Sequence, residues 1–257
     1  MSSGDIHIRV DGLTMAYGDR LIQRDLSFNV CRGDVFVIMG GSGCGKSTLL
    51  RHMIGLQRPA SGDIQYNGRS IVNASAEQCD EIRRSWGITY QSGGLFSAMT
   101  LAENVALPLE QYTGLVASEI AEIVAYKLAL VGLAGFGDYY PSELSGGMQK
   151  RAGLARAIAL DPEVLFFDEP SAGLDPISAS LLDELIVKMS QVLGATVVLV
   201  THELASIFAI GTNSVFLDNE TRTMLDGGDP RTLRDCSAHA KVRAFLKRGN
   251  SGTGDQQ

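Results

Sequence analysis

The sequence predicts an α/β fold in which buried parallel strands alternate with helices. Three observations support this fold class. Largely apolar runs at 35–39, 164–168 and 195–200 are typical of strands buried on both faces of a parallel sheet. The segment before residue 35 instead alternates apolar and polar residues, as half-exposed antiparallel strands do. In the middle third, apolar residues recur at helical spacing, which indicates a helical insertion.

Composition and charge narrow the class of protein further. A chain of 257 residues with 45% hydrophobic and 20% charged residues can form a globular domain with a large core. The net charge of −7 argues against nucleic acid as a partner, because binding a phosphate backbone needs a basic face. Asp5 and Arg9 interrupt any N-terminal signal pattern, and no uncharged apolar run approaches the roughly 20 residues that span a bilayer. Cysteines 31, 44, 79 and 236 lack disulfide or metal spacing, which favours a reducing cytoplasm.

The first third of the chain is expected to be mainly antiparallel. Residues 6–10 and 13–17 alternate on either side of an expected turn at Asp11-Gly12, and residues 26–30 alternate again. A strand at 62–66 is followed by the hairpin turn Asn67-Gly68. A helix at 77–84 and a strand at 86–90 complete this part.

From residue 92 to 156 the sequence predicts helices. Thr100 and Glu103 form the pattern of a capping box at the start of one of them, and 117–131 is amphipathic. The α/β pattern then resumes. Its expected elements are strands at 164–168 and 195–200, helices at 178–193 and 205–210, a hairpin at 214–226 and a helix at 233–248. The polar tail at 249–257 is expected to be disordered.

The strongest chemical signal is the glycine-rich segment at 40–48, called the phosphate loop here. It fits the pattern G-x-x-x-x-G-K-[ST] between a predicted buried strand and a short predicted helix. Its glycines let successive N–H groups turn toward an anion, and the helix adds a positive dipole end. Lys46 is expected to bind the β- and γ-phosphates of a nucleoside triphosphate, and Ser47 to bind Mg²⁺. The expected binding residues are Gly40, Gly41, Ser42, Gly43, Cys44, Gly45, Lys46, Ser47 and Thr48.

Two acidic residues at the end of the predicted strand 164–168 form the second signal. Ligands of α/β sheets bind beyond the carboxyl ends of the strands, where Asp168 and Glu169 are expected to lie. Asp168 is expected to complete the magnesium shell with Ser47, directly or through water. Glu169 is expected to orient and polarise the attacking water.

The segment Leu144-Ser145-Gly146-Gly147, called the signature segment here, forms the third signal. Ser145 is placed to cap a helix, but two glycines at its first positions each cost about 1 kcal/mol relative to alanine. This local cost indicates that the backbone lies very close to something, and a helix N-terminus suits an anion.

Together these motifs resemble the ATP-binding cassette (ABC) family over about residues 6–229. The phosphate loop is similar to its Walker A motif and 164–169 to its Walker B motif, with Gln91 and the signature segment in the family's order. Residues 171–175 resemble the D-loop, His202 the switch histidine, and Tyr17 the aromatic residue that stacks on adenine.

The resemblance implies a P-loop NTPase (RecA-like) core with an N-terminal antiparallel β subdomain and an inserted helical subdomain. All of 1–257 is then one nucleotide-binding domain. Its expected parts are the core at 1–91 and 157–229, the helical subdomain at 92–156, and a C-terminal helix and tail at 230–257.

The resemblance also implies a mechanism with ATP and Mg²⁺ as cofactors. Two copies face each other head to tail, and Ser145, Gly146 and Gly147 of one copy complete the site of the other. The implied catalytic residues are Glu169, His202, Lys46 and Gln91. The implied metal ligands are Ser47, Gln91 and Asp168, and the implied nucleotide contacts include Tyr17 and Asp175.

Finer features resemble the ATPase subunits of Mla/Mce-type lipid transporters. They lie at 91–96, 104–109, 143–148, 173–177 and 242–246. This implies phospholipid or another hydrophobic cargo, and a location at the cytoplasmic face of the inner membrane. The implied partners are an MlaE-like integral membrane permease, which inserts a short helix between Gln91 and the helical insertion, and a periplasmic lipid-binding protein of the Mce/MlaD type.

Three alternatives stay open at this point. A cassette ATPase for a polar solute shares most of the motifs. A soluble cassette protein acting on DNA or ribosomes predicts a coiled-coil insertion, a second cassette or a basic patch, none of which is visible in the sequence. A P-loop kinase leaves the segment at 144–149 unexplained.

Overall fold

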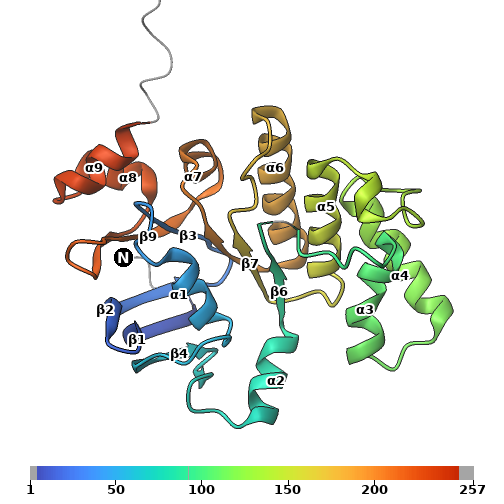
Figure 1. The fold of residues 1–257 in the computed structure, drawn as a ribbon, viewed down its shortest axis with the longest axis horizontal. Coiled ribbons are helices and arrows are strands. Elements are labelled where there is room, and N and C mark those ends of the chain that lie inside the picture. The colour runs from blue at the N-terminus through green and yellow to red at the C-terminus, as the bar shows by residue number, and fades with distance from the viewer. Residues whose placement is uncertain (1–4, 92, 249–257) are drawn as a thin grey trace, which may run out of the picture. The chain divides into compact units, whose positions relative to one another are not determined.

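The computed structural model describes residues 5–91 and 93–248, which fall into two compact units (Figure 1). The first unit holds the described residues up to Cys79 and those from Val198 on, and the second spans Asp80–Val197. Within the described residues, no helix is both long and apolar enough to cross a bilayer. The tail at 249–257, for which the sequence predicts disorder, lies outside the described residues.

An antiparallel sheet of order β2-β1-β4-β5 occupies the N-terminal part of the first unit, as predicted. Alternate residues of its long strands, among them Ile8, Leu26 and Val30, are buried in the core. The strands are β1 (Ile6–Tyr17), β2 (Arg20–Cys31), β4 (Ser61–Tyr66) and β5 (Arg69–Ser70).

The prediction of a turn at Asp11-Gly12 is wrong. Strand β1 continues through this point, and its register with β2 shifts between Val10 and Leu13. Gly12 takes a left-handed φ of 56°, and its N–H donates a hydrogen bond of 2.9 Å to the Ser27 hydroxyl. A glycine in the left-handed region suits a β-bulge as well as a turn, so the local sequence did not distinguish the two.

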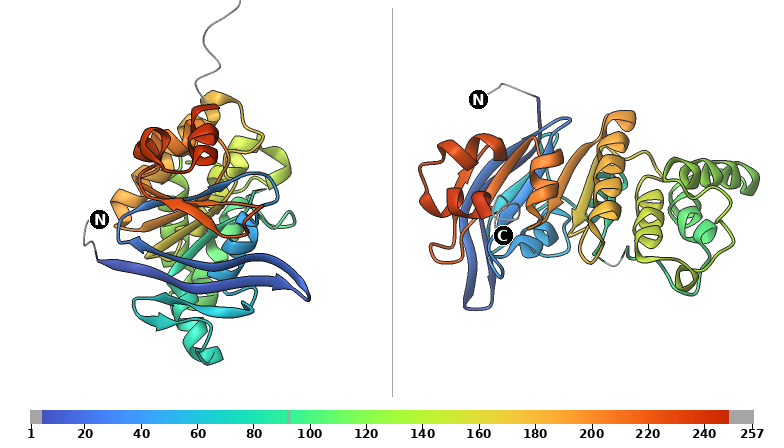
Figure 2. Two further views of the ribbon diagram at one scale, coloured as in Figure 1. Left: turned by 90° about the vertical axis from the view of Figure 1, so that its left-hand side faces the viewer. Right: turned by 90° about the horizontal axis from the view of Figure 1, so that it is seen from above.

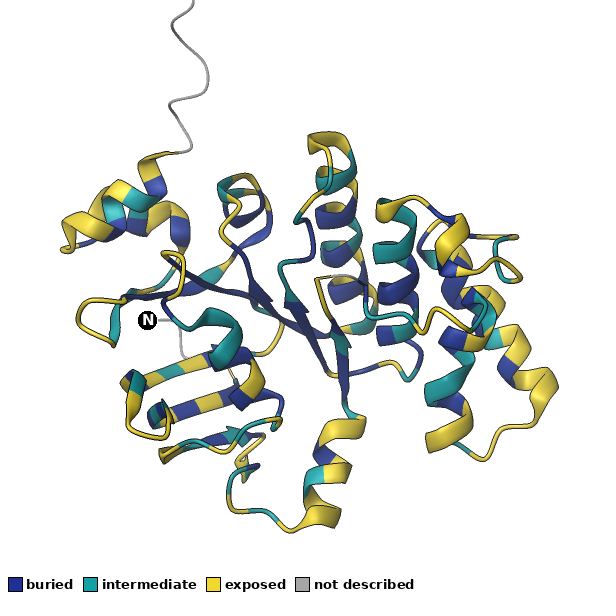
Figure 3. Cartoon of the chain, viewed as in Figure 1, coloured by how far each residue is buried: buried dark blue, intermediate teal, exposed yellow. Residues whose placement is uncertain are grey.

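The first unit also contains the predicted buried strand before the phosphate loop, β3 (Val35–Gly40). All of its residues are buried, and they are dark blue in Figure 3. It pairs in parallel with β9 (Asn213–Leu217), which forms the predicted hairpin with β10 (Met224–Gly227). The order within this unit is β10-β9-β3-β8, where β8 (Thr196–Val200) contributes residues to both units. The first unit also contains the helices α1 (Lys46–Met53) and α7 (Leu204–Ile210).

The prediction of a single helix at 233–248 is wrong, because two helices occupy this segment. Helices α8 (Pro230–Cys236) and α9 (Ala240–Lys247) lie beside each other, as the red ribbons of Figure 2 show. Ser237 lies at the break, where its hydroxyl donates to Asp226 and accepts from the His239 N–H at 3.2 Å. The bond to Asp226 of β10 holds Ser237 in place, and its hydroxyl takes the N–H of His239 out of helical bonding, which together explain the interruption.

In the second unit, β6 (Trp86–Thr89) pairs in parallel with β7 (Val164–Asp168), and the strand order is β8-β7-β6. Gly87 permits close packing of a helix on this sheet. A Cβ atom there would lie 2.2 Å from the carbonyl oxygen of Ala157, at the end of helix α5 (Gly146–Ala157). Helix α6 (Pro176–Leu193) follows β7, and α2 (Ala76–Arg84) begins in the first unit and ends in the second.

Between β6 and β7 the described residues form helices, as the sequence predicts. They are α3 (Leu101–Tyr112), α4 (Ala117–Leu130), the 3-10 turn η1 (Pro141–Glu143) and α5. The expected capping box of α3 is present, since Thr100 Oγ1 accepts from Glu103 N–H and the Glu103 carboxylate accepts from Thr100 N–H. The division into a helical subdomain at 92–156 and a core at 1–91 and 157–229 stays a prediction.

Candidate functional site

The phosphate loop connects β3 to α1 in the first unit. Gly40 and Gly45 have φ values of 148° and 97°, in the region that favours glycine. A Cβ atom at Gly40 would lie 2.4 Å from the Leu217 carbonyl oxygen, and one at Gly45 would lie 2.8 Å from Ile22 Cγ2. Both glycines are therefore required by close packing as well as by conformation.

Lys46 begins α1 and reaches back across the phosphate loop. Its Nζ atom lies 3.1 Å from the Gly40 carbonyl oxygen and 3.2 Å from that of Gly41. Among the described residues around the helix start, no side chain caps α1 and no acidic residue lies in its first turn. The first N–H groups and the ammonium group together make this end of the helix suitable for an anion.

The loop differs in exposure along its length. Gly41, Ser42 and Gly43 are exposed, whereas Ser47 and Thr48 are half-buried in the first turn of α1. Cys44 is only 2% exposed, and this burial raises the pKa of its thiol despite the opposing effect of Lys46. The backbone of the loop therefore faces solvent while its cysteine side chain belongs to the core.

Two further expected site residues of the first unit are exposed. Tyr17, at the end of β1, donates a hydrogen bond of 2.9 Å from its hydroxyl to Gln57 Oε1. His202 follows β8, and its Nε2 atom lies 3.7 Å from Glu203 Oε1. The hydrogen bond of Tyr17 to Gln57 involves its hydroxyl group and leaves the faces of its ring available for stacking.

In the second unit, the acidic pair lies at the end of β7, as predicted. Asp168 is the last residue of the strand and is half-buried. Glu169 has a φ of 50°, a left-handed conformation that is uncommon for a residue with a side chain. Strained backbone of this kind is concentrated at functional sites. The strain makes Glu169 a stronger candidate than its place in the sequence alone did.

Lys150 of α5 contacts the segment that follows the acidic pair. Its ammonium group donates a hydrogen bond to the carbonyl oxygen of Ala172. Burial lowers the pKa of Lys150, while the charge of Glu169 acts in the opposite direction. Sequence reasoning assigned no role to this lysine, because a basic residue within a predicted helix is usually solvated.

Asp175 has a local structural role that the sequence analysis missed. It is the N-cap of α6, where its Oδ1 atom accepts from Ile177 N–H at 3.1 Å and Ser178 N–H at 3.0 Å. Its Oδ2 atom accepts from the Ser178 hydroxyl at 2.6 Å, and the bonds from Ser178 lower the pKa of the carboxyl group. Aspartate followed by proline at the first helical position was a signal that could have identified the cap.

The signature segment begins α5 as predicted. Ser145 caps the helix, since its hydroxyl accepts a hydrogen bond of 3.3 Å from Met148 N–H. Ser145 and Gly146 are exposed, and Gly147 is half-buried. Among the described residues, no atom lies within 4 Å of a Cβ built at Gly146. Packing within this chain therefore does not explain why glycine stands there.

The expected metal ligands are oxygen donors from different elements. Ser47 lies in the first turn of α1, Asp168 ends β7, and Gln91 is exposed just after β6. Within the described ranges, no three His, Cys, Asp or Glu residues gather as a ready-made metal cluster. Hydroxyl, carboxylate and amide oxygens are donors that suit Mg²⁺, which binds one or two protein oxygens and completes its shell with water and phosphate.

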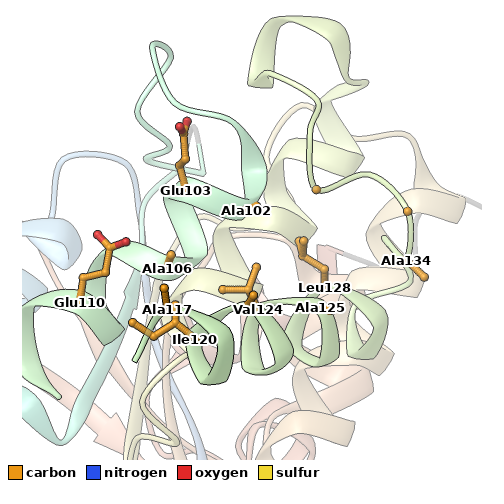
Figure 4. A pocket seen from close by; sticks show the side chains of 13 residues that line it. Ala102, Glu103, Ala106, Glu110, Ala117, Ile120, Val124, Ala125, Leu128 and Ala134 are labelled. Carbon is orange, nitrogen blue, oxygen red and sulfur yellow. The ribbon is translucent and has the colours of Figure 1, made fainter. Parts of the chain in front are cut away.

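Two cavities lie in the second unit outside these residues. One of about 430 Å³ is lined by a mixed apolar and polar set that includes Trp86, Tyr90, Phe96, Pro108 and Arg156. The other, of about 650 Å³, lies between α3 and α4, and six of its 13 lining residues are alanines (Figure 4). The larger cavity contains none of the expected site residues, and its Glu103 is engaged in the capping box.

A family model described as ABC transporter matches residues 23–172 of the chain. A Mycobacterium bovis protein named probable ribonucleotide transport ATP-binding protein mkl is 41% identical over 241 residues, which are 94% of this chain and 66% of that relative. This chain thus spans slightly less than two thirds of that relative. The Haemophilus influenzae protein named intermembrane phospholipid transport system ATP-binding protein MlaF is 38% identical over 245 residues, which are 95% of this chain and 92% of that relative.

Solved structures show the same fold. The cbiO1 protein of Clostridium perfringens, described as part of the ABC transporter complex cbiONQ, is similar with a TM-score of 0.82 and 29% identity, covering 95% of each chain. The cassette MJ0796, in a dimeric post-hydrolysis state bound to ADP and Pi, gives a TM-score of 0.76 and 27% identity, covering 86% of this chain and 98% of that one. These likenesses confirm the predicted α/β fold class.

Proposed function

This chain belongs to the ABC transporter family, since the family model matches more than half of its length, and on that premise we propose that it is the ATP-hydrolysing subunit of a transporter. The match confirms the family resemblance that the sequence motifs indicated. In this role the chain binds ATP, dimerises head to tail and powers a separate membrane permease.

The observation that carries the proposal is the pair of anion-suited helix starts. Helix α1 offers the phosphate loop and Lys46, and α5 offers the exposed Ser145 and Gly146. The glycine at 146 has a conformational cost that no contact within the described chain explains. A nucleotide held by a second copy accounts for it, because a side chain at 146 would then separate the helix start from the γ-phosphate.

In the proposed reaction, water attacks the γ-phosphorus of ATP, the bond from the γ-phosphorus to the bridging oxygen breaks, and ADP and phosphate leave. Lys46 and the loop N–H groups bind the phosphates and stabilise the charge that develops. Glu169 orients the water and accepts its proton, and His202 contacts the γ-phosphate. Ser47, Asp168 and Gln91 would hold Mg²⁺, which neutralises phosphate charge when bound.

The remaining proposed nucleotide contacts are Tyr17 and Asp175. Tyr17 stacks on adenine with its exposed ring, as its 46% exposure permits. Asp175 is proposed to contact the nucleotide, and its capping of α6 orders the start of that helix.

The permease is proposed to bind at the 430 Å³ cavity of the second unit. Tyr90 and Phe96 are 42% and 53% exposed there, and Arg156 lies over the Phe96 ring at 5.8 Å. Exposed aromatic residues beside a hollow are typical of protein-binding surfaces. A short helix with an apolar face fits this surface better than a polar loop does.

Phospholipid is the proposed cargo, because the MlaF relatives are similar over nearly their whole length. The proposed location is the cytoplasmic face of the inner membrane, with an MlaE-like permease and a periplasmic Mce/MlaD-like lipid-binding protein in the complex. The second candidate is a polar solute, since the mkl relatives are named for ribonucleotide transport.

Purification of the chain with its permease tests the proposal. Lipid extraction and mass spectrometry of the complex, together with ATPase rates in phospholipid vesicles and with added ribonucleotides, separate the two cargoes. Bound phospholipid and lipid-dependent turnover support the lipid assignment. Turnover that responds to ribonucleotides and not to lipid favours the second candidate, and failure to recover any membrane protein contradicts the transport role.

A further inference from the structure

Gln23 is a fully buried polar residue of β2 that lies against the phosphate loop. Its Nε2 atom donates one hydrogen bond of 2.7 Å to the Cys44 carbonyl oxygen and another of 2.8 Å to the Asp218 carbonyl oxygen. One amide group thus connects the loop to the residue that follows strand β9. The motifs of the sequence do not include it.

Chemistry fixes the orientation of this amide. The reversed amide would place Oε1 against two carbonyl oxygens, so Nε2 must face them. Oε1 is then left without a hydrogen-bond donor among the described residues. A buried acceptor without a donor is unfavourable, and this cost offsets part of what the two donated bonds contribute by satisfying the carbonyls of Cys44 and Asp218. The amide therefore acts chiefly through the positions of these two carbonyl groups.

The contact to Cys44 determines where the next N–H group points. In a trans peptide the C=O and N–H bonds point in opposite directions. Because Gln23 holds the Cys44 carbonyl, the N–H of Gly45 points away from Gln23, as a loop N–H group that binds an anion would. Gly45 is also packed against Ile22, the neighbour of Gln23 in β2. Strand β2 thus fixes both halves of this peptide unit.

The other anchor of the amide is itself held firmly. The Asp218 side chain is 2% exposed, and its Oδ2 atom accepts from the Thr221 N–H and hydroxyl, each at 2.9 Å. Lys241 of α9 forms an ion pair with Oδ1 at 2.5 Å. Burial raises the pKa of the Asp218 carboxyl, but the bonds from Lys241 and Thr221 outweigh it and lower the pKa to about 2.

We propose that Gln23 is a positioning residue for nucleotide binding. It presets the Cys44–Gly45 peptide in the orientation that binds a phosphate, and Asp218 braces it from the opposite side. A preset loop loses less entropy when the polyphosphate binds, so affinity rises without a direct contact to the ligand. This inference rests on the proposed ATP binding at the phosphate loop.

The test compares Gln23→Met and Gln23→Leu with the unaltered full-length chain. Both variants keep the approximate volume and remove the donor. ATP and ADP dissociation constants by titration calorimetry, the kcat and KM of ATP hydrolysis, and the thermal midpoint without nucleotide are measured. We expect affinity for both nucleotides to fall about five- to thirty-fold, the range for losing one or two buried hydrogen bonds, with kcat at saturating ATP changing less than about two-fold.

Val30→Ala is the matched control. Val30 is fully buried in the same strand, seven residues and so about 23 Å along from Gln23, and the change destabilises the sheet without altering the loop. The proposal is overturned if either folded Gln23 variant binds ATP within two-fold of the unaltered chain, or if Val30→Ala weakens binding as much. Loss of folding in both Gln23 variants also overturns it, in favour of a purely structural role. No ATP binding by the unaltered chain contradicts the proposed function itself.

Discussion

The ammonium group of Lys150 donates a hydrogen bond to the carbonyl oxygen of Ala172, so α5 is tied to the segment between β7 and α6. The same helix begins with the signature segment, and Gly147 near its start lies close to Leu174 and Ser178. Helix α5 therefore contacts the segment after the acidic pair at two points. Any movement of α5 is expected to move this segment.

Lys150→Met is expected to slow hydrolysis without loss of ATP affinity. The variant removes the donor to Ala172 and the positive charge near Glu169, so the carboxylate of this proposed general base is less well placed. A fall in kcat of about ten-fold corresponds to about 1.4 kcal/mol, a reasonable value for a lost charge-assisted hydrogen bond. Phosphate release at saturating ATP measures it, with Lys188→Met on α6 as the control. Normal turnover in Lys150→Met contradicts this role.

Glu169→Gln is expected to bind ATP and to lose nearly all turnover. Glutamine has the shape of glutamate but cannot accept the proton of the attacking water, and loss of a general base costs on the order of 10²- to 10⁴-fold. Because ATP is not consumed, the dimer should persist, which size-exclusion chromatography with ATP detects. The matched control is Glu163→Gln, at an exposed acid just before β7. Near-normal hydrolysis by Glu169→Gln excludes Glu169 as the base.

Because Cys44 is buried, its thiol is expected to react with an alkylating reagent only slowly. The sequence places the thiol inside a phosphate-binding loop, where alkylation is expected to block the nucleotide and ATP to protect it. The structure shows a thiol that is 2% exposed, whereas Cys236 is exposed. Cys236 is therefore expected to react first, and Cys44 only when the loop opens.

The pH dependence of this labelling follows from the raised pKa of Cys44. A raised pKa means that the reactive thiolate forms only at higher pH than for an ordinary thiol. The labelling rate of Cys44 should thus remain low through neutral pH and rise only at pH values above those at which an ordinary thiol reacts. Peptide mass spectrometry after timed alkylation, with and without ATP, measures both sites. Equal rates at the two cysteines at neutral pH contradict the buried position.

The sequence predicted those parts of the molecule that depend on neighbouring residues. The phosphate loop, the capping box at Thr100 and the cap at Ser145 each involve residues within a few positions of one another, so the local pattern suffices. Gln23 could not be found in this way, because its second acceptor at Asp218 lies 195 residues further along the chain. Only the folded first unit brings the two together.

The same limit explains the two wrong elements. The glycine of Asp11-Gly12 is compatible with a turn and with a bulge, and pairing of β1 with both β2 and β4 keeps the strand continuous. The break at Ser237 depends on its hydrogen bond to Asp226 in β10, which periodicity within 233–248 does not reveal. At Gly12 and at Ser237 the local sequence allows two conformations. Contacts with residues outside the local segment determine which of them forms.

Gly146→Ala is expected to affect ATP-dependent dimerisation and turnover but not the stability of the isolated chain. A Cβ atom at Gly146 meets no described atom within 4 Å, and alanine is favoured over glycine in a helix by about 1 kcal/mol. The thermal midpoint of the isolated chain should therefore stay equal or rise. ATP-dependent dimerisation and turnover should fall at least about ten-fold, because in the proposed dimer the added methyl group would stand between the start of α5 and a phosphate held by the second copy.

Gly114→Ala is the matched control, because Gly114 is also exposed and has no described atom near its Cβ position. It lies outside the signature segment and should leave both stability and turnover nearly unchanged. Calorimetry gives the thermal midpoint, and phosphate release and chromatography with ATP give the other two quantities. If Gly146→Ala dimerises and hydrolyses ATP normally, the start of α5 does not approach a nucleotide, and the glycine needs another explanation. If a second copy completes the site, Gly146→Ala should leave the isolated chain at least as stable and still reduce its turnover. Alanine favours the helix, so a loss of turnover must come from a contact outside this chain.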